Sequence, residues 1–264
     1  RVWCTLPSGA GRRRDHRPRA GEVRRLATAR GGDVVTETWG EGPVVYLMHG
    51  WGGWRGQLGA FVEPLVAAGH QVVAFDAPGH GDADPGLMGA GYGTLVEMTE
   101  TLELVHRTHG PAAGIVAHSL SCVAAASVVR AGVTTERLVL IAPGPGFDQI
   151  TRHFTGALGL SDRTRAHLDQ QVLHYTGHPV THFSLPGLGA DGAMPPTLVV
   201  HDRHDKETAH AIGAEVAATW PDATLLTTEG LGHHRLLADP ATVAAVTAHL
   251  TAARALQEHP TTGT

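Results

Sequence analysis

From Asp33 onward, apolar and polar positions follow two alternating periods along the chain. Short apolar runs of strand length are separated by longer stretches in which apolar residues recur at helical spacing. The expected strands are residues 34–38, 44–48, 71–75, 114–118, 138–141, 197–200 and 223–228. Regular alternation of strands and helices predicts an α/β fold, with a mostly parallel central sheet flanked by helices on both faces.

One region interrupts this alternation. Residues 143–195 contain no good buried strand, whereas residues 147–158 and 161–175 have helical spacing, the second with Leu168 and Val172 expected inside. Ligands bind beyond the carboxyl ends of the strands in open α/β sheets, and this region directly follows a strand. We therefore expect residues 143–195 to form a small helical lid over a pocket. The alternative is a peripheral packing element.

The predicted organisation has three parts. Residues 33–142 and 196–264 form the α/β core, residues 143–195 form the lid, and residues 1–32 form a basic N-terminal arm. Arginines are interleaved with glycine and proline in this arm, at Arg12, Arg13, Arg14, Arg17, Arg19, Arg24, Arg25 and Arg30. We expect a partly ordered, solvated peripheral segment; the alternative is a patch for an acidic partner.

Composition narrows the classes of function. A chain of 264 residues with 42% hydrophobic and 17% charged residues can bury the core of one α/β domain with an insertion. Its net charge of -5 gives no general attraction to nucleic acid or anionic lipid. No apolar run approaches the roughly 18 residues of a membrane span.

The two cysteines predict the cellular compartment, and the first residue gives an expectation about the processing of the chain. Cys4 and Cys122 lie far apart in different predicted environments, so we expect no disulfide and a cytoplasmic location. Because the chain begins with Arg1 rather than methionine, we expect it to be processed, truncated or a fragment.

The candidate nucleophile is Ser119, which directly follows the apolar run 114–118. Small residues, Ala117 and Ser121, stand two positions before and after it. A serine at a sharp turn from strand to helix is exposed to substrate, and crowding at that turn tolerates only small neighbours. The pattern therefore predicts a nucleophile elbow, although glycine is commoner at both neighbouring positions.

A serine hydroxyl needs a base, and the base needs a carboxylate that holds its tautomer. His233 and His234 lie on a loop between the last strand and the helix that begins at Asp239-Pro240. The candidate carboxylates are Asp205 and Asp202, which follow the apolar run 197–200. Because a residue immediately after a strand more often caps or turns the chain, we favour Asp205.

Acyl transfer also needs donors aimed at the oxyanion of the transition state. We expect these to be the backbone N–H groups of Leu120, after the nucleophile, and of Trp51, in the glycine-rich loop 49–53. The loop lacks the G-x-G-x-x-G and P-loop patterns of phosphate sites. We expect a substrate pocket lined by His49, Met88, Phe147, Ile150 and Phe154.

Together, these residues resemble the α/β-hydrolase family over about residues 33–250. His49-Gly50-Trp51-Gly52 resembles the family's oxyanion loop, and residues 76–81 resemble its D-x-x-G-x-G turn, which is usually structural. The order Ser119, Asp205, His233 matches the order of the family's triad, and the resemblance implies His233 rather than His234. A serine nucleophile also distinguishes the chain from epoxide hydrolases and haloalkane dehalogenases, whose nucleophile is a carboxylate.

The predicted function is hydrolysis of an ester or related acyl bond in a small apolar substrate, through an acyl-enzyme on Ser119. We expect a carboxylesterase-like or thioesterase-like enzyme without a cofactor or metal. Two alternatives remain: a ligand-binding protein that uses the same fold without chemistry, and a metal-dependent hydrolase. The metal site would be drawn from the histidines at strand ends, including His49, His80, His201, His204 and His233, but no HExxH pattern is present.

Overall fold

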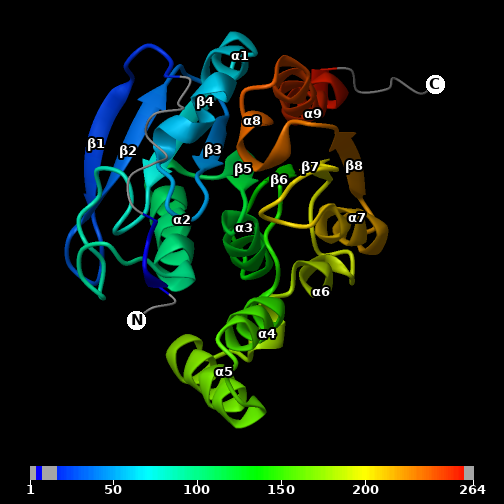
Figure 1. Cartoon of the computed structure of the whole chain (residues 1–264). Coiled ribbons are helices and arrows are strands. Elements are labelled where there is room, and N and C mark those ends of the chain that lie inside the picture. Colours follow the sequence, from blue (N-terminus) through cyan, green and yellow to red (C-terminus); the bar gives the residue numbers. More distant parts are fainter. Residues whose placement is uncertain (1–3, 8–16, 259–264) are drawn as a thin grey trace.

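The structure is a computed structural model that describes residues 4–7 and 17–258, with residues 253–258 described only as part of the last helix. One eight-stranded sheet forms its centre, in the order β1-β2-β4-β3-β5-β6-β7-β8 (Figure 1). The strands are β1 (Glu22–Ala27), β2 (Asp33–Trp39), β3 (Val44–Met48), β4 (Gln71–Asp76), β5 (Ala112–His118), β6 (Leu138–Ile141), β7 (Thr197–Asp202) and β8 (Ala223–Thr228). All neighbours from β4 to β8 pair in parallel, whereas β2 pairs antiparallel with both β1 and β4. The predicted mostly parallel sheet is confirmed.

Helices cover both faces of the sheet. They are η3 (Arg55–Phe61), α1 (Val62–Ala67), α2 (Leu95–His109), α3 (Ser121–Arg130), α4 (Phe147–Ala157), α5 (Asp162–Thr176), η4 (Val180–Phe183), α6 (Leu185–Gly189), α7 (His210–Thr219), α8 (Gly232–Arg235) and α9 (Pro240–Glu258). Successive side chains of a strand point to opposite faces, so Tyr46 and Met48 pack with α2 and α3, whereas Val45 and Leu47 pack with α1 and α9. Two apolar layers therefore enclose β3 to β7, and their parallel strands read as continuous apolar runs.

The strand β1 differs from the sequence-based expectation, which placed residues 22–27 in the peripheral arm. It pairs along its whole length with β2 at the sheet edge. Its side chains are almost all exposed, so it carries no apolar alternation that could be read from the sequence. The backbone pairing with β2 holds β1 at the edge, and Arg25 adds exposed ion pairs with Asp33 and Asp84. Arg12, Arg13 and Arg14 of the predicted arm lie outside the described residues.

The segment 143–195 is helical, as expected, and contains α4, α5, η4 and α6. In Figure 1, α5 lies outermost, on the far side of α4 from α3. Leu168 and Val172, which were expected inside, are only half-buried, and no residue of α5 is buried. The reason is that α5 packs against α4 and η4 rather than against the sheet. Whether this segment closes over a pocket stays a prediction.

Candidate active site

The sharp turn after β5 holds Ser119 in a left-handed backbone conformation. Its φ is 59°, and only Ala142 shares a positive φ among the described residues other than glycine. Such a conformation costs about 1–3 kcal/mol and persists only where the surroundings impose it. Here β6 and the loop after it impose this conformation, because Ser119 N–H donates to the Ile141 carbonyl at 2.9 Å, and Gly144 N–H donates to the Ser119 carbonyl at 3.2 Å. The expected elbow geometry is therefore present.

The turn after β8 brings His233 to Ser119, across more than a hundred residues of sequence. His233 Nε2 lies 3.0 Å from Ser119 Oγ, and His233 Nδ1 lies 2.7 Å from Asp205 Oδ2. The His233 side chain is 4% exposed and that of Asp205 is fully buried. These partners assign the ring nitrogens: Nδ1–H donates to the carboxylate, and Nε2 accepts from the Ser119 hydroxyl.

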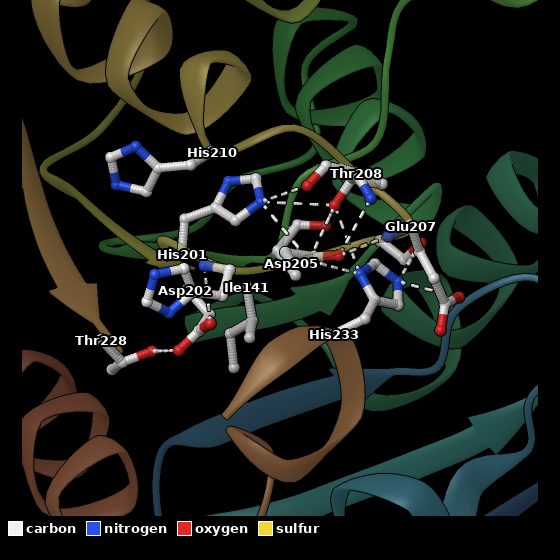
Figure 2. A network of polar contacts seen from close by, with 12 residues as sticks. Ile141, His201, Asp202, Asp205, Glu207, Thr208, His210, Thr228 and His233 are labelled. Atoms are coloured by element: carbon white, nitrogen blue, oxygen red, sulfur yellow. Dashed lines mark hydrogen bonds and ion pairs between the residues drawn. The ribbon is translucent and has the colours of Figure 1, made fainter. Parts of the chain in front are cut away.

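A dense network fixes the Asp205 carboxylate (Figure 2). Glu207 N–H and Thr208 N–H donate to Oδ1 at 2.8 and 3.0 Å, and the Thr208 hydroxyl donates to Oδ2 at 3.0 Å. His201 Nε2 lies 3.5 Å from the same oxygen. Burial alone would raise the pKa of Asp205, but the hydrogen bonds from His201, His233 and these neighbours lower it far below its usual value. The network therefore favours the ionised form of Asp205.

Asp202 and His234, the alternatives for the carboxylate and the base, have other partners. Asp202 accepts hydrogen bonds from Leu231 N–H at 2.9 Å and from the Thr228 hydroxyl at 2.8 Å, as Figure 2 shows for Thr228. It therefore fixes the loop that leads to His233 instead of contacting the imidazole. His234 Nε2 lies 3.0 Å from Glu207 Oε1, at a position that is 39% exposed. Of the four residues weighed for the base and its carboxylate, the structure brings only His233 and Asp205 to Ser119.

Both expected oxyanion donors lie beside the elbow. Leu120 is the residue between Ser119 and α3, and the loop 49–53 approaches so closely that a Cβ on Gly50 would lie 3.1 Å from Ser119 Cβ. Among the hydrogen bonds of the described residues, neither Leu120 N–H nor Trp51 N–H has an acceptor. Two backbone donors without an acceptor next to a serine hydroxyl suit an anionic ligand atom.

The expected pocket residues differ in how deeply the structure buries them. Phe147 is buried against the Phe183 ring, and Ile150 and Trp51 pack on the same apolar cluster. Phe154 is half-buried in α4, and Met88 is half-buried in the loop between β4 and α2. The prediction for His49 needs correction, because its side chain is fully buried and both ring nitrogens are used inside the protein. His49 supports the loop rather than lining a pocket.

Several residues around Ser119, His233 and Asp205 could not be identified from the sequence. Thr208 contacts both His233 Nδ1, at 3.2 Å, and Asp205. His118 is buried directly before Ser119, and its Nε2–H donates to the His233 carbonyl at 3.0 Å. Burial and the neighbouring His233 and His234 lower the pKa of His118 well below its usual value. Proximity to the Ser119 and Asp205 motifs was the one available signal, since threonine and histidine have no distinctive spacing here.

A cavity of about 540 Å³ lies elsewhere, between the β1–β2 turn and α2. Its lining includes the ion pair of Arg30 with Glu100, together with Glu97 and Arg107, and none of the predicted site residues. Among the described residues, no group of three or more His, Cys, Asp or Glu side chains is arranged to hold a metal ion. A search of the described helices finds none with the length and apolarity needed to cross a bilayer.

Comparison with known protein families and solved structures identifies the class of protein to which this fold belongs. Residues 44–246 match the sequence model of the Alpha/beta hydrolase family, which is more than half of the chain. The chain therefore belongs to the α/β-hydrolase family, as the resemblance of its motifs implied. No curated protein matches its sequence.

Solved structures show the same fold at low sequence identity. A hydrolase from Pseudomonas aeruginosa superposes with a TM-score of 0.67 at 21% identity, covering 88% of this chain and 99% of that one. The thioesterase domain of the curacin biosynthetic pathway has a TM-score of 0.63 at 18% identity, with 88% and 99% coverage. Est1E from Butyrivibrio proteoclasticus, solved with ferulic acid bound, has a TM-score of 0.66 at 15% identity, with 90% and 100% coverage.

Proposed function

We propose that this protein is a serine hydrolase that cleaves an ester or related acyl bond of a small apolar substrate through an acyl-enzyme on Ser119. The observation that carries the proposal is the continuous contact from Ser119 Oγ to His233 Nε2, 3.0 Å, and from His233 Nδ1 to Asp205 Oδ2, 2.7 Å. A hydroxyl, an imidazole and a buried carboxylate in this order form the arrangement that activates a serine nucleophile.

The reaction proceeds in two steps. Ser119 Oγ attacks the acyl carbon while His233 Nε2 takes the hydroxyl proton, and Asp205 stabilises the imidazolium that results. The N–H groups of Leu120 and Trp51 donate to the oxyanion, each worth about 3 kcal/mol in the transition state. His233 then protonates the leaving group as its bond to the acyl carbon breaks. A water molecule deprotonated by the same imidazole attacks the acyl-enzyme, and the proton passes from His233 to Ser119 Oγ as the acid is released.

The apolar residues near the site support an apolar acyl group. Phe147 and Ile150 belong to the segment that leaves the sheet directly beside Ser119, because Gly144 N–H donates to the Ser119 carbonyl. In the proposed enzyme this segment covers the acyl group and excludes water from the intermediate. Ester and thioester hydrolysis both fit this geometry, and a thioesterase domain is among the structures with this fold.

Acyl p-nitrophenyl esters and acyl thioesters of increasing chain length test the proposal, with the wild type and Ser119→Ala measured side by side. We expect Ser119→Ala to lower kcat by about 10⁴-fold or more at unchanged melting temperature, since no nucleophile remains. Activity that survives in Ser119→Ala and is abolished by a chelator would instead favour the metal-dependent alternative. Binding of these ligands without turnover by the wild type would favour the ligand-binding protein.

A further inference from the structure

Ser121 is the small residue two positions after the proposed nucleophile, where the family most often has glycine. It is the first residue of α3 and is fully buried. Its hydroxyl donates a hydrogen bond to the backbone carbonyl of His49, at the start of the loop that carries Trp51. Glycine or alanine would meet the steric demand of the turn equally well, so crowding alone does not explain a hydroxyl at this position.

The peptide groups of this loop are fixed one after another. Ser121 holds the His49 carbonyl, while the Gly50 carbonyl accepts hydrogen bonds from His49 Nδ1–H at 2.8 Å and from Gly53 N–H at 3.0 Å. In a trans peptide the N–H of Trp51 points opposite to the Gly50 carbonyl. Anchoring that carbonyl therefore sets the direction of the Trp51 N–H.

The His49 ring completes the anchor from the other side. Its Nε2 accepts a hydrogen bond from Ala77 N–H at 3.2 Å, which ties the loop to the turn after β4. Burial lowers the pKa of His49 to about 4, which keeps the ring neutral and able to accept this bond. Ser121 is the part of the anchor that comes from the elbow itself, since it stands two residues from Ser119 in the same turn.

The loop and the elbow are in close contact, so a small shift of one changes its distance to the other. A Cβ on Gly50 would lie 2.8 Å from His118 Nδ1 and 3.1 Å from Ser119 Cβ, which leaves no room between them. The stabilisation of an oxyanion depends steeply on donor position, and a misplacement of about 1 Å can cost about 100-fold in rate. The hydrogen bond from Ser121 to the His49 carbonyl, which links the elbow to the loop, is therefore expected to affect the catalytic rate.

We infer that Ser121 is a positioning residue: by fixing the His49 carbonyl at the start of the loop, its hydroxyl helps to hold the following Gly50–Trp51 peptide, and so the Trp51 N–H, at the correct distance from Ser119 for the oxyanion. This inference rests on the proposed serine mechanism. Without the hydrogen bond from Ser121, substrate would still contact the apolar residues Phe147 and Ile150, but the transition state would lose part of one donor. The loss therefore falls on kcat rather than on KM.

The test compares Ser121→Ala and Ser121→Gly with Ser127→Ala. Ser127 lies on the same helix, and its hydroxyl has no hydrogen-bond partner among the described residues, so its removal is a matched control. With a p-nitrophenyl ester we expect both Ser121 variants to lower kcat by about 10-fold with KM unchanged within about twofold. Ser127→Ala should match the wild type. Restoring the family's commoner glycine at 121 should therefore reduce activity.

A second measurement reports on the oxyanion donors without turnover. Diethyl p-nitrophenyl phosphate and its thiophosphate analogue inactivate serine hydrolases at rates whose ratio depends on hydrogen bonds to the P=O oxygen, because sulfur is the weaker acceptor. We expect this ratio to fall in Ser121→Ala and Ser121→Gly and to stay at the wild-type value in Ser127→Ala. Loss of fold stability alone would slow both reagents equally and leave the ratio unchanged.

Ser119→Ala, measured in parallel, separates the two claims. If Ser119→Ala is inactive but the Ser121 variants have wild-type kcat and wild-type phosphate-to-thiophosphate ratios, the role of Ser121 is overturned and the serine mechanism stands. If Ser119→Ala keeps its activity, the serine mechanism itself fails.

Discussion

The region of the proposed triad, Ser119, His233 and Asp205, differs from the helix α5 in how deeply its side chains are buried. Around Asp205 every carboxylate oxygen is hydrogen-bonded and the side chain is fully buried. In α5 no residue is buried, and Leu173 and Tyr175 are 46% and 76% exposed. The proposed chemistry therefore depends on a rigid network at the strand ends, whereas α5, which packs mainly against α4 and η4, is expected to contribute little to the stability of the fold.

The largest expected effect distinguishes the two aspartates of the triad region. Asp205→Asn should lower kcat by about 10⁴-fold, because an amide at this position holds His233 in the wrong tautomer. Asp202→Asn should cost far less activity, since Asp202 contacts Leu231 and Thr228 and not the imidazole. Steady-state kinetics on both variants provide the measurement. Equal losses would mean that Asp205 acts only through the loop structure.

The next effect concerns stability and compares the sheet with the helical segment directly. Leu140 in β6 is fully buried, so Leu140→Ala should lower the free energy of unfolding by about 2–5 kcal/mol through lost burial and a cavity. Leu173→Ala in α5 should change it by less than about 0.5 kcal/mol. Denaturant titration measures both. A comparable loss at Leu173 would show that α5 is part of the cooperative core.

A smaller effect on the free energy of unfolding is expected as the pH falls. Burial lowers the pKa of His80 to about 4, with the neighbouring His49 adding to the shift, whereas a histidine in the unfolded chain titrates near 6.5. Between pH 6.5 and 4 the unfolded state binds the additional proton, so stability falls as pH falls, by up to about 1.4 kcal/mol per pH unit for each such histidine.

The variant His80→Gln should therefore flatten the pH dependence of the free energy of unfolding below pH 6.5. His153→Gln, at an exposed position of α4, is the control and should keep the wild-type slope. Denaturant titrations at pH 7, 6, 5 and 4.5 give the two slopes. Parallel slopes for the wild type and His80→Gln would contradict the assignment.

Much of the fold was predictable because its strands are buried on both faces and so read as continuous apolar runs, as in β5 and β6. The edge strand β1 was not predictable, because its side chains are almost all exposed and form no continuous apolar run. Ser119 and Asp205 could be selected from their places after strands, and family resemblance was needed to choose His233 over His234. Thr208, His118 and His201 lie close in the chain to Ser119 or Asp205, but threonine and histidine have no distinctive spacing there, and the contacts of Thr208 and His118 with His233 form only in the fold.

The central claim is that His233 and Asp205 make Ser119 nucleophilic, and one measurement tests it most directly. The wild type is incubated with a fluorophosphonate, digested, and the modified peptide is sequenced by mass spectrometry. The account predicts one adduct, on Ser119, that forms at least about 10³-fold more slowly in His233→Gln. No adduct on folded wild-type protein, or an adduct that forms equally fast in His233→Gln, would contradict it.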